Sequence, residues 1–212
     1  YLDDGLRDVV TTIDDLGLAG QTLVIVVADH GESMTEHGIF YDHYGLHDHV
    51  LHVPFIMRMP GRLPGGVRLP QMLNHTDVAP TLLEVAGLSV PAAMEGQSLW
   101  PLATGAESHG GHDETISEEC SWQAAWSLRT DRYKFIVARE PDEDGCYPRE
   151  LYDLVADPAE EHNIVAERPD VAAALEARLE EWIAEHLHAV GREEDPLREQ
   201  GTTLRMMMQA LD

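Results

Sequence analysis

Gln21-Thr22-Leu23-Val24-Ile25-Val26-Val27-Ala28-Asp29-His30-Gly31-Glu32 is the most informative stretch of this chain. The six residues from Leu23 to Ala28 are apolar and mostly β-branched, which is typical of a strand buried on both faces in a parallel sheet. The run then ends on a carboxylate, an imidazole and a glycine. Open α/β sheets usually bind ligands at this edge, and Gly31 allows the backbone to turn sharply there. A strand followed by an ordinary polar loop is the simpler interpretation of Asp29-His30-Gly31 taken alone.

Histidines are concentrated just after this strand. Six of the chain's twelve histidines lie between His30 and His52. Histidine is a common metal ligand and changes charge near neutral pH, so this concentration indicates a functional site. Asp29 and His30 could both bind one divalent cation. Because consecutive strand side chains point to opposite faces, this requires the strand to have turned already, as Gly31 permits.

Several short motifs follow one another along the chain. The first are Asp29-His30-Gly31, Glu36-His37-Gly38, Val53-Pro54-Phe55-Ile56 and Pro60-Gly61. Later come Thr76-Asp77, Pro80-Thr81-Leu82-Leu83, Ala86-Gly87, Ser127 to Phe135, Glu150 to Leu154, Asp157-Pro158 and Glu161-His162-Asn163. In this order the motifs resemble the C-terminal half of the sulfatase family, within the alkaline phosphatase superfamily. The order is far more specific than any single motif.

The resemblance implies an α/β fold class: a partial parallel sheet like that of sulfatases and alkaline phosphatases, flanked by helices, with a small C-terminal antiparallel α+β subdomain. We expect residues 1–105 to be the C-terminal part of the α/β domain, 106–120 a linker, 121–190 the small subdomain and 191–212 a tail. Apolar residues at steps of three and four predict helices over residues 2–16, 76–86 and 169–188. Short apolar runs bounded by turn residues predict strands over residues 23–28, 53–59, 122–129, 133–137 and 150–154.

The resemblance also implies roles for particular residues. Asp29 and His30 stand where the family holds its catalytic metal with Asp-Asn, or with Asp-His in a branch that includes phosphonate monoester hydrolases. Ca²⁺ is the favoured ion and Mn²⁺ the second choice, in a site that two ligands leave incomplete. His43 occupies the place of a family lysine or histidine that contacts the anionic group of the substrate. As an imidazolium, His43 could stabilise an oxygen of that group or protonate the leaving oxygen.

Other polar residues of this region have more than one interpretation. Glu32 and His37 are undecided, and both could orient the metal ligands. Three further histidines are expected to be packed or surface residues without a catalytic role: His47, His49 and His52. A structural role at the start of a helix is the favoured interpretation of His75.

The nucleophile of the resembled family has no match in this chain. Near their N-terminus, sulfatases carry two further metal-binding aspartates and a Cys/Ser-x-Pro-x-Arg motif whose first residue becomes formylglycine. Cys120 is followed by Ser-Trp-Gln and Cys146 by Tyr-Pro-Arg, which is the wrong spacing in the wrong half. Two cysteines are too few for a disulfide framework, so we expect two free thiols. We also expect the chain to be the C-terminal portion of a longer enzyme, with very low activity alone.

Three functions fit these observations. The first is a sulfatase-like hydrolase of sulfate esters, and the second is a phosphodiesterase or phosphonate monoester hydrolase of the same superfamily. Asp29-His30 in place of Asp-Asn keeps the second open. The third is a non-catalytic relic of the sulfatase fold or an interaction protein. For the first two, the predicted partner is a small-molecule sulfate or phosphate ester.

The charge balance excludes several classes of partner. The 212 residues include 39 acidic and 14 basic side chains, for a formal net charge of −25. Nucleic acid and anionic membranes bind basic surfaces, so neither is expected. No apolar run reaches the roughly 18 residues of a transmembrane segment, and no signal peptide is visible. A cytoplasmic location is favoured, but it is not assigned because we expect the chain to start inside a domain.

Two features of composition predict further properties. Lys134 is the only lysine. Strong acidity with almost no lysine is typical of proteins that stay soluble in concentrated salt, which suggests a halophilic source. An acidic protein from an arginine-rich genome is the alternative. In the tail, Met206, Met207 and Met208 suit an adaptable apolar contact with the same chain or with a second copy in a homo-oligomer.

Overall fold

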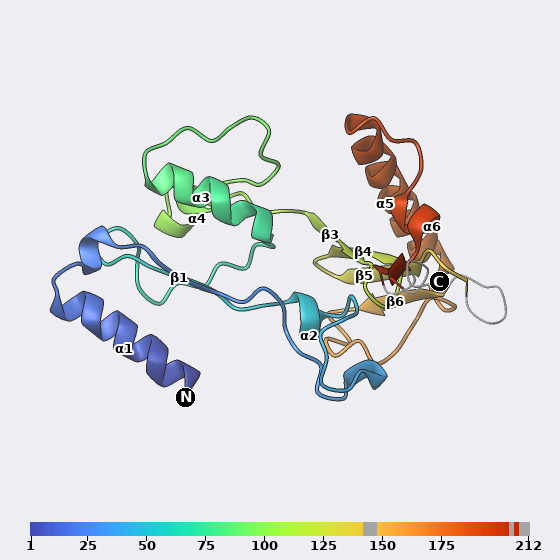
Figure 1. Ribbon diagram of the computed structural model, residues 1–212, viewed down its shortest axis with the longest axis horizontal. Coiled ribbons are helices and arrows are strands. Elements are labelled where there is room, and N and C mark those ends of the chain that lie inside the picture. Colours follow the sequence, from blue (N-terminus) through green and yellow to red (C-terminus); the bar gives the residue numbers. More distant parts are fainter. Residues whose placement is uncertain (142–147, 204–205, 208–212) are drawn as a thin grey trace. The chain divides into compact units, whose positions relative to one another are not determined.

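The computed structural model describes residues 1–141, 148–203 and 206–207 (Figure 1). The chain forms two compact units. The first contains Tyr1–Ala28 and Pro54–His112, and the second contains Asp29–Val53 and Asp113–Asp212. These units differ from the predicted domains, because the histidine-rich segment after the first strand belongs with the C-terminal part of the chain. Among the described residues, no helix has the length and apolar character needed to cross a bilayer.

The first unit contains three α-helices, two strands and two 3₁₀ turns. They are α1 (Leu2–Asp15), η1 (Ala19–Gln21), β1 (Val24–Val27), β2 (Phe55–Arg58), η3 (His75–Asp77), α3 (Val78–Val85) and α4 (Trp100–Thr104). The predicted helices and strands of this region are therefore present. Gly17 and Gly87 follow α1 and α3 with positive φ angles of 69° and 72°, a conformation that glycine adopts without strain at helix ends.

The pairing and burial of β1 differ from the prediction. β1 pairs with β2 in antiparallel fashion, with Val24 opposite Arg58 and Val27 opposite Phe55. Val27 is 41% exposed and Ile56 of β2 is 57% exposed. Within the described part of the chain this sheet has only two strands, so no neighbouring strand covers its apolar residues. The expected parallel pairing and two-sided burial are not seen here.

Helix α1 has the predicted apolar stripe, but the described chain covers it only in part, at the half-buried residues Val10 and Ile13. No residue of α1 is buried, and Leu2, Val9 and Leu16 are 77%, 54% and 66% exposed. A helix of this length is only marginally stable in water unless its apolar face packs against another element. Most of the stripe is therefore an exposed apolar surface of the first unit.

A buried carboxylate organises the helical part of the first unit. Asp77 is 0% exposed and accepts hydrogen bonds from the backbone amides of Asn74 (2.8 Å) and Gln97 (2.9 Å). The Nε2 atom of His112 lies 2.9 Å from Oδ2 of the same residue. Asn74 and Asp77 form a capping box at the start of η3, so the helical stretch begins slightly before the predicted start at residue 76.

The second unit is a four-stranded antiparallel sheet with helices. Its elements are η2 (Glu36–Gly38), α2 (Asp48–Leu51), β3 (Glu114–Glu119), β4 (Ala125–Thr130), β5 (Tyr133–Ala138), β6 (Arg149–Asp153), α5 (Pro169–Ala189) and α6 (Pro196–Gln200). The strands follow one another in the order β3-β4-β5-β6. The predicted antiparallel lobe with one long amphipathic helix is present, and α5 matches the predicted range closely.

The two faces of this sheet carry different cores. Side chains of a strand alternate between faces. One face is packed by α5 and α6 through buried apolar residues: Trp126, Leu128, Phe135, Val137, Leu151, Leu175, Leu179, Ile183 and Leu197. The other face carries Ala125, Ile136 and Tyr152, which pack with Leu46 and Leu51 of the histidine-rich segment. Residues 29–53 are thus held on the sheet face opposite α5.

Two predicted boundaries in this part of the chain are wrong. The segment expected to be a linker, 106–120, includes strand β3, which pairs with β4 from Glu114 opposite Thr130 to Glu119 opposite Ala125. The segment expected to be a tail, 191–212, includes α6, whose Leu197 is only 5% exposed within the core. Within residues 191–212, α6 therefore packs against its own chain. Met208 lies outside the described residues.

Candidate functional site

Gly31 shapes the turn that follows the first strand. Its amide donates a hydrogen bond to the carbonyl of Val50 at 2.7 Å. A Cβ atom at this position would lie 2.0 Å from the carbonyl oxygen of His49, which is impossible without moving the backbone. Only glycine allows the two chain segments to approach this closely. The turn that the sequence predicted at Gly31 is therefore required by a contact with residues 49–50.

Asp29 and His30 present a carboxylate and an imidazole nitrogen on the same side of this turn. The Nδ1 atom of His30 donates to the carbonyl of Gly31 at 2.8 Å, because a carbonyl only accepts. The lone pair of His30 is therefore on Nε2, which lies 3.7 Å from Oδ2 of Asp29. The backbone amide of His30 donates to Oδ1 of Asp29, and this bond is the main cause that lowers the pKa of the carboxyl. Asp29 is thus ionised and His30 can bind a cation through Nε2.

His43 lies directly against His30. The two rings stack with centroids 4.0 Å apart and planes inclined by 17°. The Nδ1 atom of His43 is 3.6 Å from Oε2 of Glu32 and 3.7 Å from Oδ1 of Asp42. The structure therefore brings the three residues named from the sequence, Asp29, His30 and His43, into one place. Their chemical roles remain predictions.

Glu32 joins this group, although the sequence left its role undecided. One donor atom each of His30, Glu32 and His43 lies within 4.8 Å of the other two, so the three side chains could hold a metal ion. All three are partly exposed, with 39%, 44% and 54% of the side-chain surface accessible. A ligand from solvent can therefore reach them.

A short backbone pairing explains why His43 returns to His30. Ser33 and Asp42 form an isolated antiparallel bridge, with amide-to-carbonyl distances of 2.8 and 3.3 Å. The Ser33 side chain is fully buried and its hydroxyl bonds to the carbonyl of Ile39 at 2.9 Å. Glu36 caps the loop by accepting from the amides of residues 34 and 35, which lowers its pKa to about 2. The bridge sets Asp42-His43 beside Gly31-Glu32.

A buried ion network fixes the segment onto the sheet. Lys134 of β5 is 0% exposed and pairs with Asp48 of α2 and, at 2.9 Å, with Oε1 of Glu160. Glu160 also accepts from the backbone amide of Asp48 at 2.6 Å. Burial acts to raise the pKa of Asp48, but Lys134 and Arg129 outweigh it, so the pKa is lowered overall. The sequence offered one signal for this network, a single lysine inside an apolar strand.

Three other histidines of the segment pack together below the loop. His37, His47 and His49 stack with centroid separations of 3.6, 5.3 and 5.8 Å. The Nε2 atom of His47 lies 3.2 Å from Oε2 of Glu150, which also accepts from the hydroxyl of Tyr152. Burial lowers the pKa of His37 and of His49, and the neighbouring imidazoles add to this effect. These rings pack onto β6.

The remaining sequence candidates lie outside this group. His52 is exposed, and His75 uses Nε2 to bond the carbonyl of Ala28 at 3.0 Å. Cys120 is a free thiol in a half-buried position, while Cys146 lies outside the described residues. The expectation of two free thiols can thus be checked only for Cys120.

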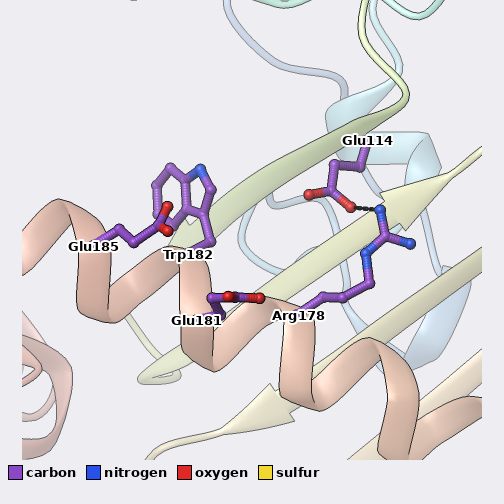
Figure 2. A pocket seen from close by; sticks show the side chains of 5 residues that line it. All are labelled: Glu114, Arg178, Glu181, Trp182 and Glu185. Carbon is purple, nitrogen blue, oxygen red and sulfur yellow. Dashed lines mark hydrogen bonds and ion pairs between the residues drawn. The ribbon is translucent and has the colours of Figure 1, made fainter.

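A separate shallow pocket lies between α5 and β3 and includes none of the sequence candidates. Figure 2 shows its lining, with Arg178 of α5 pointing toward Glu114 of β3. Its volume is about 310 Å³, and it is lined by Glu114, Arg178, Glu181, Trp182 and Glu185. Arg178 and Glu114 form an ion pair, so the pocket is a charged surface feature of the second unit.

Comparison with known proteins identifies the family. Residues 35–186 match the family described as N-sulphoglucosamine sulphohydrolase, C-terminal. The chain belongs to the sulfatase family, within the alkaline phosphatase superfamily, and matches its C-terminal portion. The resemblance inferred from the order of the motifs is confirmed.

Individual relatives and structures agree with this assignment. Arylsulfatase K of Rattus norvegicus is 31% identical over 187 residues, which cover 84% of this chain and 32% of the relative. Delta 4,5-hexuronate-2-O-sulfatase of Bacteroides thetaiotaomicron is 30% identical over 174 residues, covering 76% and 34%. The structure of phosphonate monoester hydrolase of Agrobacterium radiobacter is similar with a TM-score of 0.73 and 26% identity, covering 87% of this chain and 39% of that one. The α/β sulfatase fold class is confirmed, although the described strands pair in antiparallel fashion. The chain spans about a third of the length of these curated relatives.

Proposed function

We propose that this chain is the C-terminal portion of a sulfatase-like hydrolase of sulfate esters. The observation that carries the proposal is the grouping of Asp29, His30 and His43: Nε2 of His30 lies 3.7 Å from Oδ2 of Asp29, and the His43 ring stacks on the His30 ring. An anionic ester at this place would meet a metal-binding pair and a second imidazole together. Similarity to Arylsulfatase K supports sulfate esters as the substrate class.

The donors of Asp29 and His30 fit a divalent cation, which sulfatases generally require. An ionised carboxylate and an imidazole with its lone pair on Nε2 suit Ca²⁺, the favoured ion, or Mn²⁺. When bound, the ion would polarise a sulfuryl oxygen and offset its negative charge. Two protein ligands are fewer than such a site needs, so the remaining ligands would come from residues outside this chain.

His43 is the proposed catalytic residue of this chain. Its side chain is 54% exposed, and carboxylate oxygens of Glu32 and Asp42 lie 3.6 and 3.7 Å from Nδ1. These carboxylates can orient the ring toward the ester. As an imidazolium, His43 would stabilise a sulfuryl oxygen or donate a proton to the leaving oxygen.

The nucleophile is proposed to lie outside this chain. The 212 residues contain no Cys/Ser-x-Pro-x-Arg motif. The exposed apolar residues of the α1 region, with Val27 and Ile56, support the same view, because a larger sulfatase domain would bury such surfaces. The isolated chain should therefore hydrolyse sulfate esters very slowly.

Two alternatives remain. Hydrolysis of a phosphonate monoester or phosphodiester is supported by the Asp29-His30 pair and by the similarity to phosphonate monoester hydrolase. A non-catalytic interaction protein with the sulfatase fold is supported by the exposed apolar surface of the first unit. A homo-oligomer contact through the tail is a separate proposal, supported by the exposure of Met206 (39%) and Met207 (63%).

Hydrolysis assays with two proteins test the proposal. The first is the isolated chain, and the second is the complete product of its gene, including any sequence encoded before Tyr1. Each is given an aryl sulfate, a phosphonate monoester and a phosphodiester with Ca²⁺ or Mn²⁺. We expect turnover of the aryl sulfate by the complete product and almost none by the chain alone.

Three other assay results would each contradict one part of the proposal. Turnover by the isolated chain at an ordinary enzymatic rate would show that the nucleophile is within the 212 residues. A complete product that prefers the phosphonate or phosphodiester would favour the phosphoryl alternative. A complete product without the nucleophile motif and without turnover would favour the non-catalytic alternative.

A further inference from the structure

We infer that His30, Glu32 and His43 form a second cation site, suited to a borderline transition metal such as Zn²⁺ and distinct from the Asp29–His30 pair. One donor atom of each of the three side chains lies within 4.8 Å of the other two. In the described part of the chain, no other set of three histidine, cysteine or carboxylate side chains meets this condition.

The backbone holds the three side chains together before any ion binds. Gly31 is fixed by its hydrogen bond to the carbonyl of Val50. This bond also positions the two residues that flank Gly31, His30 and Glu32. The bridge between Ser33 and Asp42 then places His43 next to Glu32. An ion would therefore bind side chains whose backbones are already ordered, which lowers the entropy cost of binding.

The donor set determines the class of ion. Two imidazoles and one carboxylate are the three protein ligands of many zinc sites, with a fourth position left for a solvent or substrate ligand. Ca²⁺ instead takes six to eight oxygen ligands, so it is disfavoured by a site with two nitrogens. The hydrogen bond from Nδ1 of His30 to the carbonyl of Gly31 leaves Nε2 as the nitrogen available for the ion.

Binding requires a small movement of the rings. Donor atoms around a tetrahedral Zn²⁺ lie about 3.3 Å apart, so the three side chains must converge from their present positions. The parallel rings of His30 and His43 must also tilt, because each nitrogen binds an ion in the plane of its own ring. Both side chains are partly exposed, at 39% and 54%, so solvent leaves room for this rotation.

The two cation sites exclude one another because they share His30. An ion bound to either nitrogen of His43 would prevent the ring from being the imidazolium that is proposed to contact the substrate. This consequence rests on the proposed function, whereas binding of the ion does not. In a sulfatase-like enzyme, Zn²⁺ would thus compete with the catalytic cation and inhibit.

Calorimetric titration of the purified chain with Zn²⁺ tests the inference without measuring turnover. We expect one tight site in the wild-type chain. Glu32→Gln and His43→Gln should each weaken it by about tenfold or more, because each removes one ligand. Histidine NMR spectra should show perturbation of the His30 and His43 rings on addition of Zn²⁺.

Matched variants separate this site from general attraction of cations to an acidic chain. His109→Gln and Glu161→Gln remove an exposed imidazole and an exposed carboxylate elsewhere and should not change the affinity. Circular dichroism checks that each variant is folded. Unchanged affinity in folded Glu32→Gln and His43→Gln variants would overturn the inference, and so would an equal loss of affinity in His109→Gln or Glu161→Gln. If the complete enzyme did not hydrolyse sulfate esters, the proposed function would be wrong, but the Zn²⁺ titrations would still test the cation site.

Discussion

The imidazole rings of His37 and His47 lie face to face, with centroids 3.6 Å apart and planes inclined by only 11°. Parallel rings this close cannot both carry a charge without strong repulsion. His49 adds a third ring 5.3 Å from His37. The stack joins the loop that carries the candidate site to Glu150 and Tyr152 of β6.

Acid should therefore loosen the second unit. The folded pKa values of His37 and His49 lie below the ordinary 6.5, first because of burial and then because of neighbouring imidazoles. The unfolded chain then binds more protons than the folded chain, so stability is full above about pH 6.5 and falls as the pH drops through this value. Urea midpoints from pH 8 to pH 5 should show this decrease. A His37→Gln/His49→Gln variant should show a flatter profile, and a rise in wild-type stability toward pH 5.5 would contradict the argument.

Removal of the buried cation should be severely destabilising. Lys134→Met leaves the Asp48 and Glu160 carboxylates without their shared partner in a site where the lysine is 0% exposed. We expect a loss of about 3–5 kcal/mol in the free energy of unfolding. Urea unfolding followed by tryptophan fluorescence measures it. Lys134→Met/Glu160→Gln should recover part of the loss, whereas Arg192→Gln, which breaks an exposed pair with Glu199, should cost less than about 1 kcal/mol.

A methyl group at Gly31 should disturb the site loop. In Gly31→Ala, the new Cβ would meet the His49 carbonyl oxygen at 2.0 Å, so we expect a loss of about 1–3 kcal/mol. Hydrogen exchange of amides in residues 29–53 should accelerate. Gly5→Ala is the control, because nothing lies within 4 Å of a Cβ there and alanine favours the helix. Equal protection in Gly31→Ala and the wild type would show that the close approach is not needed.

Loss of His43 should reduce catalysis more than folding. In the complete enzyme, His43→Gln removes the proposed proton donor and should lower kcat for an aryl sulfate by about 10²–10⁴-fold. The exposed position of His43 predicts little change in the unfolding midpoint. His52→Gln, also exposed, should leave kcat unchanged. An active His43→Gln enzyme would remove His43 from the catalytic machinery.

Salt should stabilise the chain if its acidity is an adaptation to a saline environment. A net charge of −25 over 212 residues produces self-repulsion that dissolved ions screen. Under the halophile hypothesis, the unfolding temperature rises steadily from low salt to molar KCl. A protein that is equally stable without salt would instead be an acidic protein from an arginine-rich genome.

Local patterns in the sequence were sufficient for much of the fold. The apolar steps of α1 and α5 and the turn residues around β5 and β6 predicted these elements with small boundary errors. Strand β3 was missed because its sequence, Glu114 to Glu119, is mostly polar and charged, and only its pairing with β4 makes it a strand. The antiparallel partner of β1 could not be read from the sequence, because a short apolar run suits either direction of pairing.

The candidate site shows the same division between local and long-range information. Asp29 and His30 are adjacent, so their cooperation could be predicted from the strand end alone. The place of Glu32 depends on the bridge between Ser33 and Asp42, which no spacing rule predicts. The role of Lys134 in β5 depends on Glu160, which is distant in sequence and lies in the loop after β6.

The buried position of Lys134 gives this chain an unusual chemical reporter. No other lysine exists among the 212 residues, and this one is enclosed by two carboxylates. Acylating reagents that attack lysine amines should leave the folded chain unlabelled at this position. Appearance of an acyl group on Nζ would then record, molecule by molecule, each opening of the contact between the site loop and β5.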